Sequence, residues 1–182
     1  MTRIVGIDLS LTSTGVAVIT DRYIHTDRIT STGHKDDSLS ERRQRLHDLA
    51  LAIRNHVLTT DLVVIEQPAY SRKTGHMHDR SGLWWLVVDR LEHYATEIVE
   101  VPPTARSKYA TGKGNAAKDH VLAAVIRRYP EVEVTGNDEA DALVLAAMGA
   151  RALGHPIEVS LPQTHLDAMA KVAWPTDTEG AA

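Results

Sequence analysis

Apolar residues along this chain follow two different periods. Five short segments are continuously apolar or alternate with polar residues, which is typical of strands; they cover residues 2–9, 14–20, 23–30, 61–66 and 98–101. Elsewhere apolar residues recur every three or four positions, as on the buried face of a helix; these segments are 38–59, 81–96, 105–110, 116–129, 138–153 and 164–172. Three strands followed by alternating helices and strands predict an α/β domain that begins with an antiparallel meander.

Local signals mark where two of these helices begin. Ser38-Leu39-Ser40-Glu41 is a capping box, in which the serine and the glutamate each accept a hydrogen bond from a free backbone N–H. Asn137 stands where a cap of the last long helix is expected.

In the helix over 81–96 the predicted core stripe is Leu83, Val87, Leu91 and Tyr94.

Length and composition narrow the class of protein. A chain of 182 residues suits one domain; we assign residues 1–154 to it and 155–182 to a C-terminal extension whose end is expected to be disordered. The absence of cysteine excludes disulfides, thiolate metal sites and cysteine nucleophiles. No apolar run reaches the roughly 20 residues of a membrane-spanning helix. The first residues lack a signal-peptide pattern, so a cytoplasmic protein is expected.

The distribution of charge says more than its sum. The formal net charge of −4 argues weakly against a nucleic-acid partner. However, residues 102–118 contain no acid, and residues 68–80 contain one acid against three basic side chains. These loops are either ordinary solvated loops or surfaces that bind phosphates. The basic residues are Arg72, Lys73, Arg80, Arg106, Lys108, Lys113 and Lys118.

Two of the predicted strands carry a carboxylate near the carboxyl end. Asp8 follows one apolar run and Glu66 follows another. An unpaired carboxylate is costly to bury, so each side chain must lie at an open edge or hold a cation. If the two strands are neighbours, the acids lie side by side at the sheet edge where α/β proteins place ligands. A simpler account is that Asp8 starts a turn.

The last long helix adds two more acids. Asp138 and Asp141 are three residues apart and therefore share a face, whereas Glu139 points away from them. A simpler account of these acids is that negative charge in a first helical turn stabilises the helix. This account explains Asp141 least well, because Asp141 lies among alanines that are expected to pack inward. Clustered oxygen ligands select hard cations, Mg²⁺ or Mn²⁺. A two-metal site of this kind suits phosphodiester hydrolysis.

Several short motifs occur in a fixed order over about residues 4–150; they are Gly6-Ile7-Asp8, the turn at Gly15, Ile65-Glu66-Gln67-Pro68, Thr111-Gly112-Lys113-Gly114 with Ala117-Lys118, and Asn137-Asp138-Glu139-Ala140-Asp141-Ala142. Together they resemble the RuvC family of Holliday-junction resolvases, in the ribonuclease H-like superfamily. The resemblance implies a five-stranded mixed sheet of order 3-2-1-4-5 with helices on both faces. It also implies a metal-dependent endonuclease that resolves four-way DNA junctions by paired phosphodiester hydrolysis.

The resemblance also implies roles for individual residues. The catalytic set that binds two Mg²⁺ ions, with Mn²⁺ as a substitute, is Asp8, Glu66, Asp138 and Asp141. Lys108, Lys113 and Lys118 are implied to contact DNA or support the active site.

The chain departs from the family after the catalytic glutamate. The family commonly has an aromatic residue three positions further on, near the exchange point of the junction; here Ala69 holds that position and the aromatic is Tyr70. We expect Tyr70 to stack on an unpaired base, unless it is buried under its loop. A four-way junction has approximate two-fold symmetry, so we expect a homodimer. Trp85, off the core stripe, is the candidate for the dimer contact; the alternative is that it folds onto a neighbouring loop.

Other functions use parts of the same pattern. Residues 6–15 also resemble the phosphate loop of actin-like ATPases and sugar kinases, but those proteins need a second domain that this length cannot supply. The main alternative is a related nuclease that cuts RNA in RNA/DNA hybrids or processes precursor RNA. A catalytically silent DNA-binding relative is a third reading.

Overall fold

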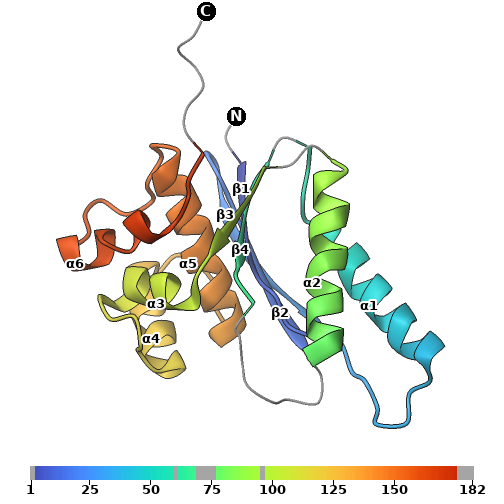
Figure 1. Ribbon diagram of the computed structural model, residues 1–182. Coiled ribbons are helices and arrows are strands. Elements are labelled where there is room, and N and C mark those ends of the chain that lie inside the picture. Colours follow the sequence, from blue (N-terminus) through green and yellow to red (C-terminus); the bar gives the residue numbers. More distant parts are fainter. Residues whose placement is uncertain (1–2, 60, 69–76, 95–96, 176–182) are drawn as a thin grey trace, which may run out of the picture.

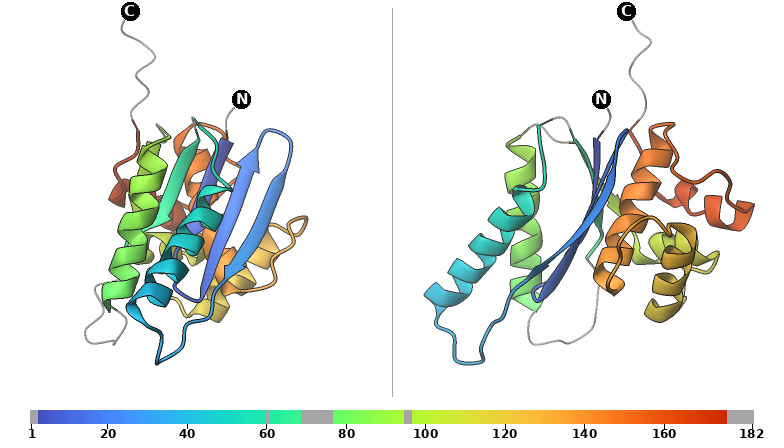
Figure 2. Two further views of the ribbon diagram at one scale, coloured as in Figure 1. Left: turned by 90° about the vertical axis from the view of Figure 1, so that its right-hand side faces the viewer. Right: turned by 180° about the vertical axis from the view of Figure 1, so that it is seen from behind.

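A five-stranded sheet lies between helices on both of its faces (Figures 1 and 2). The computed structural model describes residues 3–59, 61–68, 77–94 and 97–175. The strands are β1 (Arg3–Asp8), β2 (Ser13–Thr20), β3 (Ile24–Thr30), β4 (Leu62–Glu66) and β5 (Glu97–Val101), in the order β3-β2-β1-β4-β5. The first three strands pair antiparallel, and β1, β4 and β5 pair parallel. The predicted mixed sheet and its strand order are therefore confirmed.

The helices divide unevenly between the two faces of the sheet. On one face lie α1 (Leu39–Arg54) and α2 (Met77–Glu92). On the other face α5 (Asn137–Ala152) packs directly on β1, β2 and β4, and α3 (Pro103–Thr111), α4 (Lys118–Arg128) and α6 (Gln163–Leu166) lie outside it (Figure 1). A short 3-10 turn, Met169–Lys171, follows α6. No described helix is long and apolar enough to cross a membrane.

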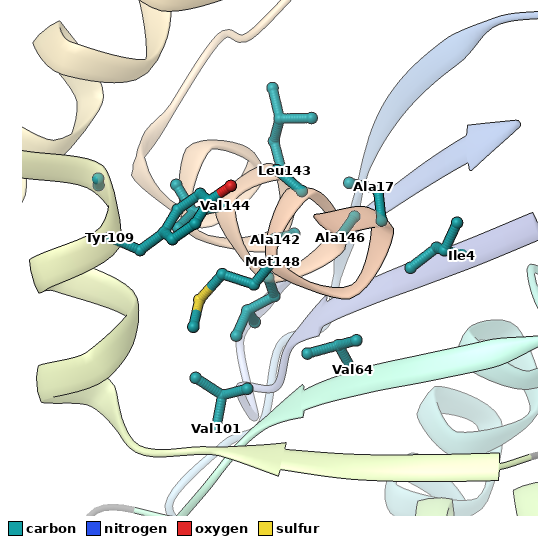
Figure 3. Packing of buried hydrophobic residues seen from close by; sticks show 14 of the residues in the cluster. Ile4, Ala17, Val64, Val101, Tyr109, Ala142, Leu143, Val144, Ala146 and Met148 are labelled. Atoms are coloured by element: carbon teal, nitrogen blue, oxygen red, sulfur yellow. The ribbon is translucent and has the colours of Figure 1, made fainter. Parts of the chain in front are cut away.

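Two apolar clusters hold these layers together. Val5, Ile7, Val63 and Ile65 point toward α1 and α2. Their neighbours on the same strands point toward α5, because successive side chains of a strand face opposite ways. Figure 3 shows this second cluster, in which Ile4 and Val64 meet Ala142, Ala146 and other side chains of α5. The alanines bring the backbone of α5 close to the sheet.

The ends of three helices differ from the predictions. The sequence predicts that the first helix reaches residue 59, but it ends at Arg54 with Asn55 as its C-cap, and a turn at residues 55 and 56 follows. Beyond that turn the Leu58 N–H donates to Asp61 Oδ2 at 2.7 Å. The second begins at Met77, four residues earlier than expected, and ends before Tyr94, which is 40% exposed.

The N-cap of α5 is Gly136 and not Asn137, and the cap makes no side-chain hydrogen bond. Glu139 reaches back instead and accepts a hydrogen bond from the Thr135 N–H at 2.7 Å.

The C-terminal extension packs against the second cluster. Ala168 is fully buried there. The buried Glu158 accepts hydrogen bonds from the hydroxyls of Tyr109 and Tyr129 and from Arg151. The expected helical segment over 164–172 is present as α6 and the 3-10 turn. The expected disorder at the chain end concerns residues 176–182, which lie outside the described residues.

Candidate active site

Asp8 and Glu66 lie side by side at the carboxyl edge of the sheet. In the parallel pair β1/β4, Ile7 is opposite Ile65, so the next residue of each strand occupies the same register position. Both acids line a pocket of about 260 Å³, together with Asp138 from the first turn of α5. The neighbouring-strand prediction therefore holds, and the structure brings three of the four candidate carboxylates to one pocket.

The first turn of α5 reaches this pocket because β2 lacks a side chain at one position. Gly15 pairs with Asp8, and a Cβ on Gly15 would lie 1.9 Å from the Asp138 carbonyl oxygen. The hydroxyl of Ser13 then donates to Asp138 Oδ2 at 2.5 Å. The sequence prediction did not single out Ser13; its place in a hydroxyl-rich turn beside Asp8 was the available signal.

Asp141, the fourth carboxylate, lies deeper and is 1% exposed. Its Oδ1 accepts a hydrogen bond from the guanidinium of Arg106, which also donates to Glu66 Oε2. Arg106 was expected to contact phosphate from an exposed loop, but only 7% of it is exposed. The burial argues against that role, because α3 directs this side chain inward to the acids.

The pKa of Asp8 is raised by its burial and by the acids beside it. Burial, which disfavours the charged form, and then the nearby charge of Glu66 raise the pKa of Asp8 to about 7. Arg106 and Lys118 lower it by less, and Asp138 raises it slightly. A cation beside Asp8 would therefore favour its charged form.

The donor set fits a hard divalent cation, although the present side-chain positions do not assemble a complete site. All four candidates supply carboxylate oxygens, the ligands that Mg²⁺ and Mn²⁺ prefer. Asp141 Oδ2 is buried without a hydrogen-bond partner, an expensive state for a carboxylate oxygen. Among the described residues, no three carboxylate or histidine side chains are grouped as ligands of one ion. Arg106 lies between Glu66 and Asp141 and donates a hydrogen bond to each.

The remaining predicted residues are dispersed. Lys118, at the start of α4, and Arg80 of α2 line the carboxylate pocket. Lys113 lies in a different hollow of about 560 Å³ between α3, α4 and α6, and Lys108 pairs with Asp167 at 3.4 Å. Trp85 is 65% exposed on α2. Tyr70, Arg72 and Lys73 lie outside the described residues.

Glu139 is directed away from the pocket, as expected, but it is buried. Both of its carboxylate oxygens accept hydrogen bonds from the Thr135 hydroxyl, at 2.8 and 2.9 Å. Its contribution is therefore to the start of α5.

The curated relatives of this chain indicate one family. No family model matches the chain. The crossover junction endodeoxyribonuclease RuvC of Rhizobium johnstonii is 32% identical over 152 residues, and that of Agrobacterium fabrum is 31% identical over 153 residues. Each alignment covers 79% of this chain and 86% of the relative.

Solved structures show the same fold. RuvC of Thermus thermophilus superposes with a TM-score of 0.60 at 18% identity, over 85% of this chain and 98% of that one. The T. thermophilus RuvC in complex with a Holliday junction substrate gives 0.62 at 17% identity, with the same coverage. The Holliday junction resolvase of fowlpox virus gives 0.54 at 14% identity, over 84% of this chain and 99% of that one. With curated relatives above 30% identity along four fifths of its length, this chain belongs to the RuvC family.

Proposed function

We propose that this chain is a metal-dependent endonuclease that cuts four-way DNA junctions by hydrolysing a phosphodiester bond in each of two strands. The observation that carries the proposal is the lining of one pocket. Asp8, Glu66 and Asp138 supply oxygen ligands there, and Arg80 and Lys118 supply positive charge for a phosphate. Relatives that are named crossover junction endodeoxyribonucleases support the choice of substrate.

Asp8, Glu66, Asp138 and Asp141 would hold the cations, Mg²⁺ or Mn²⁺. When bound, two such ions activate a water and neutralise the charge that develops on the leaving oxygen. Ser13 orients Asp138 by donating to its Oδ2. Lys118, exposed at the mouth of the pocket, attracts the phosphate that is to be cut.

We further propose that the enzyme acts as a homodimer. A four-way junction has approximate two-fold symmetry, so paired incisions require two active sites related by a two-fold axis. Three large apolar side chains of α2 are exposed; they are Met77, Trp85 and Leu86, at 53%, 65% and 36%. Trp85 is the largest of them; it shares its side of the helix with the exposed acids Asp89 and Glu92 and is our candidate for a contact between two copies.

The function is tested by comparing substrates in one experiment. Purified protein is incubated with a labelled four-way junction, with a linear duplex of the same arm sequence, and with an RNA/DNA hybrid. Each incubation contains Mg²⁺ or EDTA. We expect cleavage of the junction alone, in Mg²⁺ alone. Preferential cleavage of the hybrid would establish the related ribonuclease activity instead, and undiminished junction cleavage in EDTA would exclude the metal mechanism.

A further inference from the structure

Arg106 lies where the proposed function places a metal ion. Its Nε donates to Glu66 Oε2 and one Nη donates to Asp141 Oδ1. The side chain comes from α3 and is 9% exposed, and those of Glu66 and Asp141 are 17% and 2% exposed. One cation therefore bridges two acids that belong to different elements, with one hydrogen bond to each.

The guanidinium of Arg106 does not fill all the hydrogen-bonding positions of Glu66 and Asp141. It binds one oxygen of each acid, and Asp141 Oδ2 stays buried without a partner. The carboxylates of the described residues are not grouped as ligands of a single ion while the arginine lies between them. The arrangement is that of a cation site whose present occupant is a side chain.

We propose that Arg106 is a built-in counter-cation of the metal-free enzyme, which a divalent ion must displace from Glu66 and Asp141 in order to bind. The inference rests on the proposed function, since it needs these acids to be metal ligands. In this role Arg106 is a positioning residue: it acts through the two acids by holding them in place before metal arrives.

Elementary electrostatics supports an exchange of cations. Three or four carboxylates at one sheet edge repel one another, so a fold that forms without metal needs another positive charge there. Arginine stays protonated at all ordinary pH values, so deprotonation cannot free the acids and competition by another cation can. The arginine side chain has several rotatable bonds, so it can leave without a movement of α3. Metal affinity is then reduced by the free energy of breaking the ion pair.

The movement is tested directly in the wild-type protein by nuclear magnetic resonance. The Nε–H signal of Arg106 is identified as the one that R106K lacks, and Mg²⁺ is then titrated. We expect this signal to shift or broaden in proportion to metal binding, which is measured by calorimetry on the same sample. A signal that stays unchanged at saturating Mg²⁺ overturns the proposal.

Metal affinity supplies a second, independent test. R106M keeps a side chain of similar length without charge, and R106K keeps the charge without the fork that reaches both acids. We expect R106M to bind Mn²⁺ about tenfold more tightly than wild type, a typical size for coupling between two sites, with R106K in between. R43M changes an exposed arginine of α1 and should leave the affinity unchanged.

Stability separates competition from a merely structural role. R106M should melt lower than wild type in EDTA and gain more from added Mn²⁺; unfolding in EDTA with refolding in Mn²⁺ also supports the proposal. Weaker Mn²⁺ binding by both folded variants overturns it, because Arg106 would then assist the metal site. A wild-type protein that binds no Mn²⁺ overturns this inference and the metal mechanism together. Junction cleavage with an unmoved Arg106 signal overturns this inference alone.

Discussion

Three acids within one turn of α5 have three different environments. Asp138 lines the pocket and accepts a hydrogen bond from Ser13. Asp141 is buried against Arg106. Glu139, between them in sequence, bonds Thr135 at the start of the helix. Helix periodicity places Glu139 on a different side of the helix from Asp138 and Asp141. Substitutions of Glu139 and of Asp141 should therefore have different effects.

Asp141→Asn should abolish junction cleavage and leave junction binding intact, because it removes a metal ligand and no phosphate contact. Glu139→Gln should leave cleavage per folded molecule close to wild type. Its cost is in stability, about 1 kcal/mol, because a charged acceptor of backbone and hydroxyl hydrogen bonds becomes a neutral one. Cleavage rates at saturating Mg²⁺, together with melting temperatures, measure both effects. Equal loss of cleavage in the two variants would contradict the assignment of separate roles.

The grouping of Asp8 with Glu66 could be predicted from the sequence because it needs only two adjacent parallel strands with acids at the same end. The placement of Arg106 could not. It depends on how α3 packs against α5 near the end of β4, and no local periodicity carries that information. The choice of Gly136 as the N-cap was also hidden, since a side chain three residues later supplies the acceptor that Asn137 was expected to provide.

At the scale of elements, the site depends on how closely α5 approaches the sheet. A Cβ on Gly6 would lie 2.1 Å from the Ala142 carbonyl oxygen, and one on Gly15 would lie 1.9 Å from that of Asp138. Both contacts are with backbone atoms, which cannot rotate away. The sequence marked these glycines as motif residues, and the structure gives the physical reason for them.

Gly15→Ala should lower the free energy of unfolding by about 1–3 kcal/mol or more, because α5 must move off β2. The movement displaces Asp138, so cleavage should fall beyond what the loss of folded protein explains. Gly82→Ala is the matched control. Its Cβ would meet only Leu46 Cδ1 at 3.7 Å, and replacing a helical glycine should stabilise α2 by roughly 1 kcal/mol. Denaturant unfolding and cleavage rates decide the outcome; a harmless Gly15→Ala would contradict the close packing.

The C-terminal extension is tied to the helical layer through Glu158. Both tyrosine hydroxyls are protonated at neutral pH and donate to Glu158; burial, and then the charge of Glu158, raise the pKa values of Tyr109 and Tyr129 further. Arg151 donates to its other oxygen at 2.9 Å. The hydrophobic pattern along the chain contains no sign of this polar cluster, because Tyr109, Tyr129 and Arg151 lie 49, 29 and 7 residues before Glu158 in the sequence.

Glu158→Gln should destabilise the protein by about 1–3 kcal/mol, since buried donors lose a charged acceptor. For a chain of this size that corresponds to a fall in melting temperature of roughly 2–4 °C per kcal/mol. Glu131→Gln, at an exposed position after α4, should leave the melting temperature unchanged. Calorimetric scans of the three proteins test this; identical curves would show that the extension adds no stability through Glu158.

At the scale of the whole molecule, the basic side chains lie in more than one place: Lys118 lines the carboxylate pocket, whereas Lys113 lines a separate hollow. Lys113→Ala should weaken binding to junction and duplex alike and reduce the salt dependence of binding by about one unit of slope, because a phosphate contact releases counterions. Arg22→Ala is the control. It lies in the turn between β2 and β3, at the end of the sheet opposite Asp8. Binding measured over a series of salt concentrations checks the prediction, and an unchanged slope for Lys113→Ala would remove this residue from the DNA surface.

The assembly of the molecule depends on α2. Leu83, Val87 and Leu91 are buried against the sheet layer, as their spacing predicted, so the opposite face of the helix is left outward. Trp85 lies on that outward side and is 65% exposed. Its ring is perpendicular to the ring of Trp84, with 4.8 Å between the two ring centroids. The sequence located Trp85 off the core stripe, but periodicity within one chain does not identify what covers it.

Trp85→Asp should convert a dimer into a folded monomer, because a charge cannot be buried in an apolar contact without a partner. Sedimentation measures the change in mass, and the melting temperature should fall little because Trp85 is mostly exposed in the single chain. Ile126→Asp, which changes a 48% exposed residue of α4 across the sheet, should leave the dimer intact. On a plasmid with an extruded cruciform the monomer should make single nicks where the dimer makes paired cuts, since the two active sites are no longer joined. A Trp85→Asp protein that still sediments as a dimer would assign the contact to another surface.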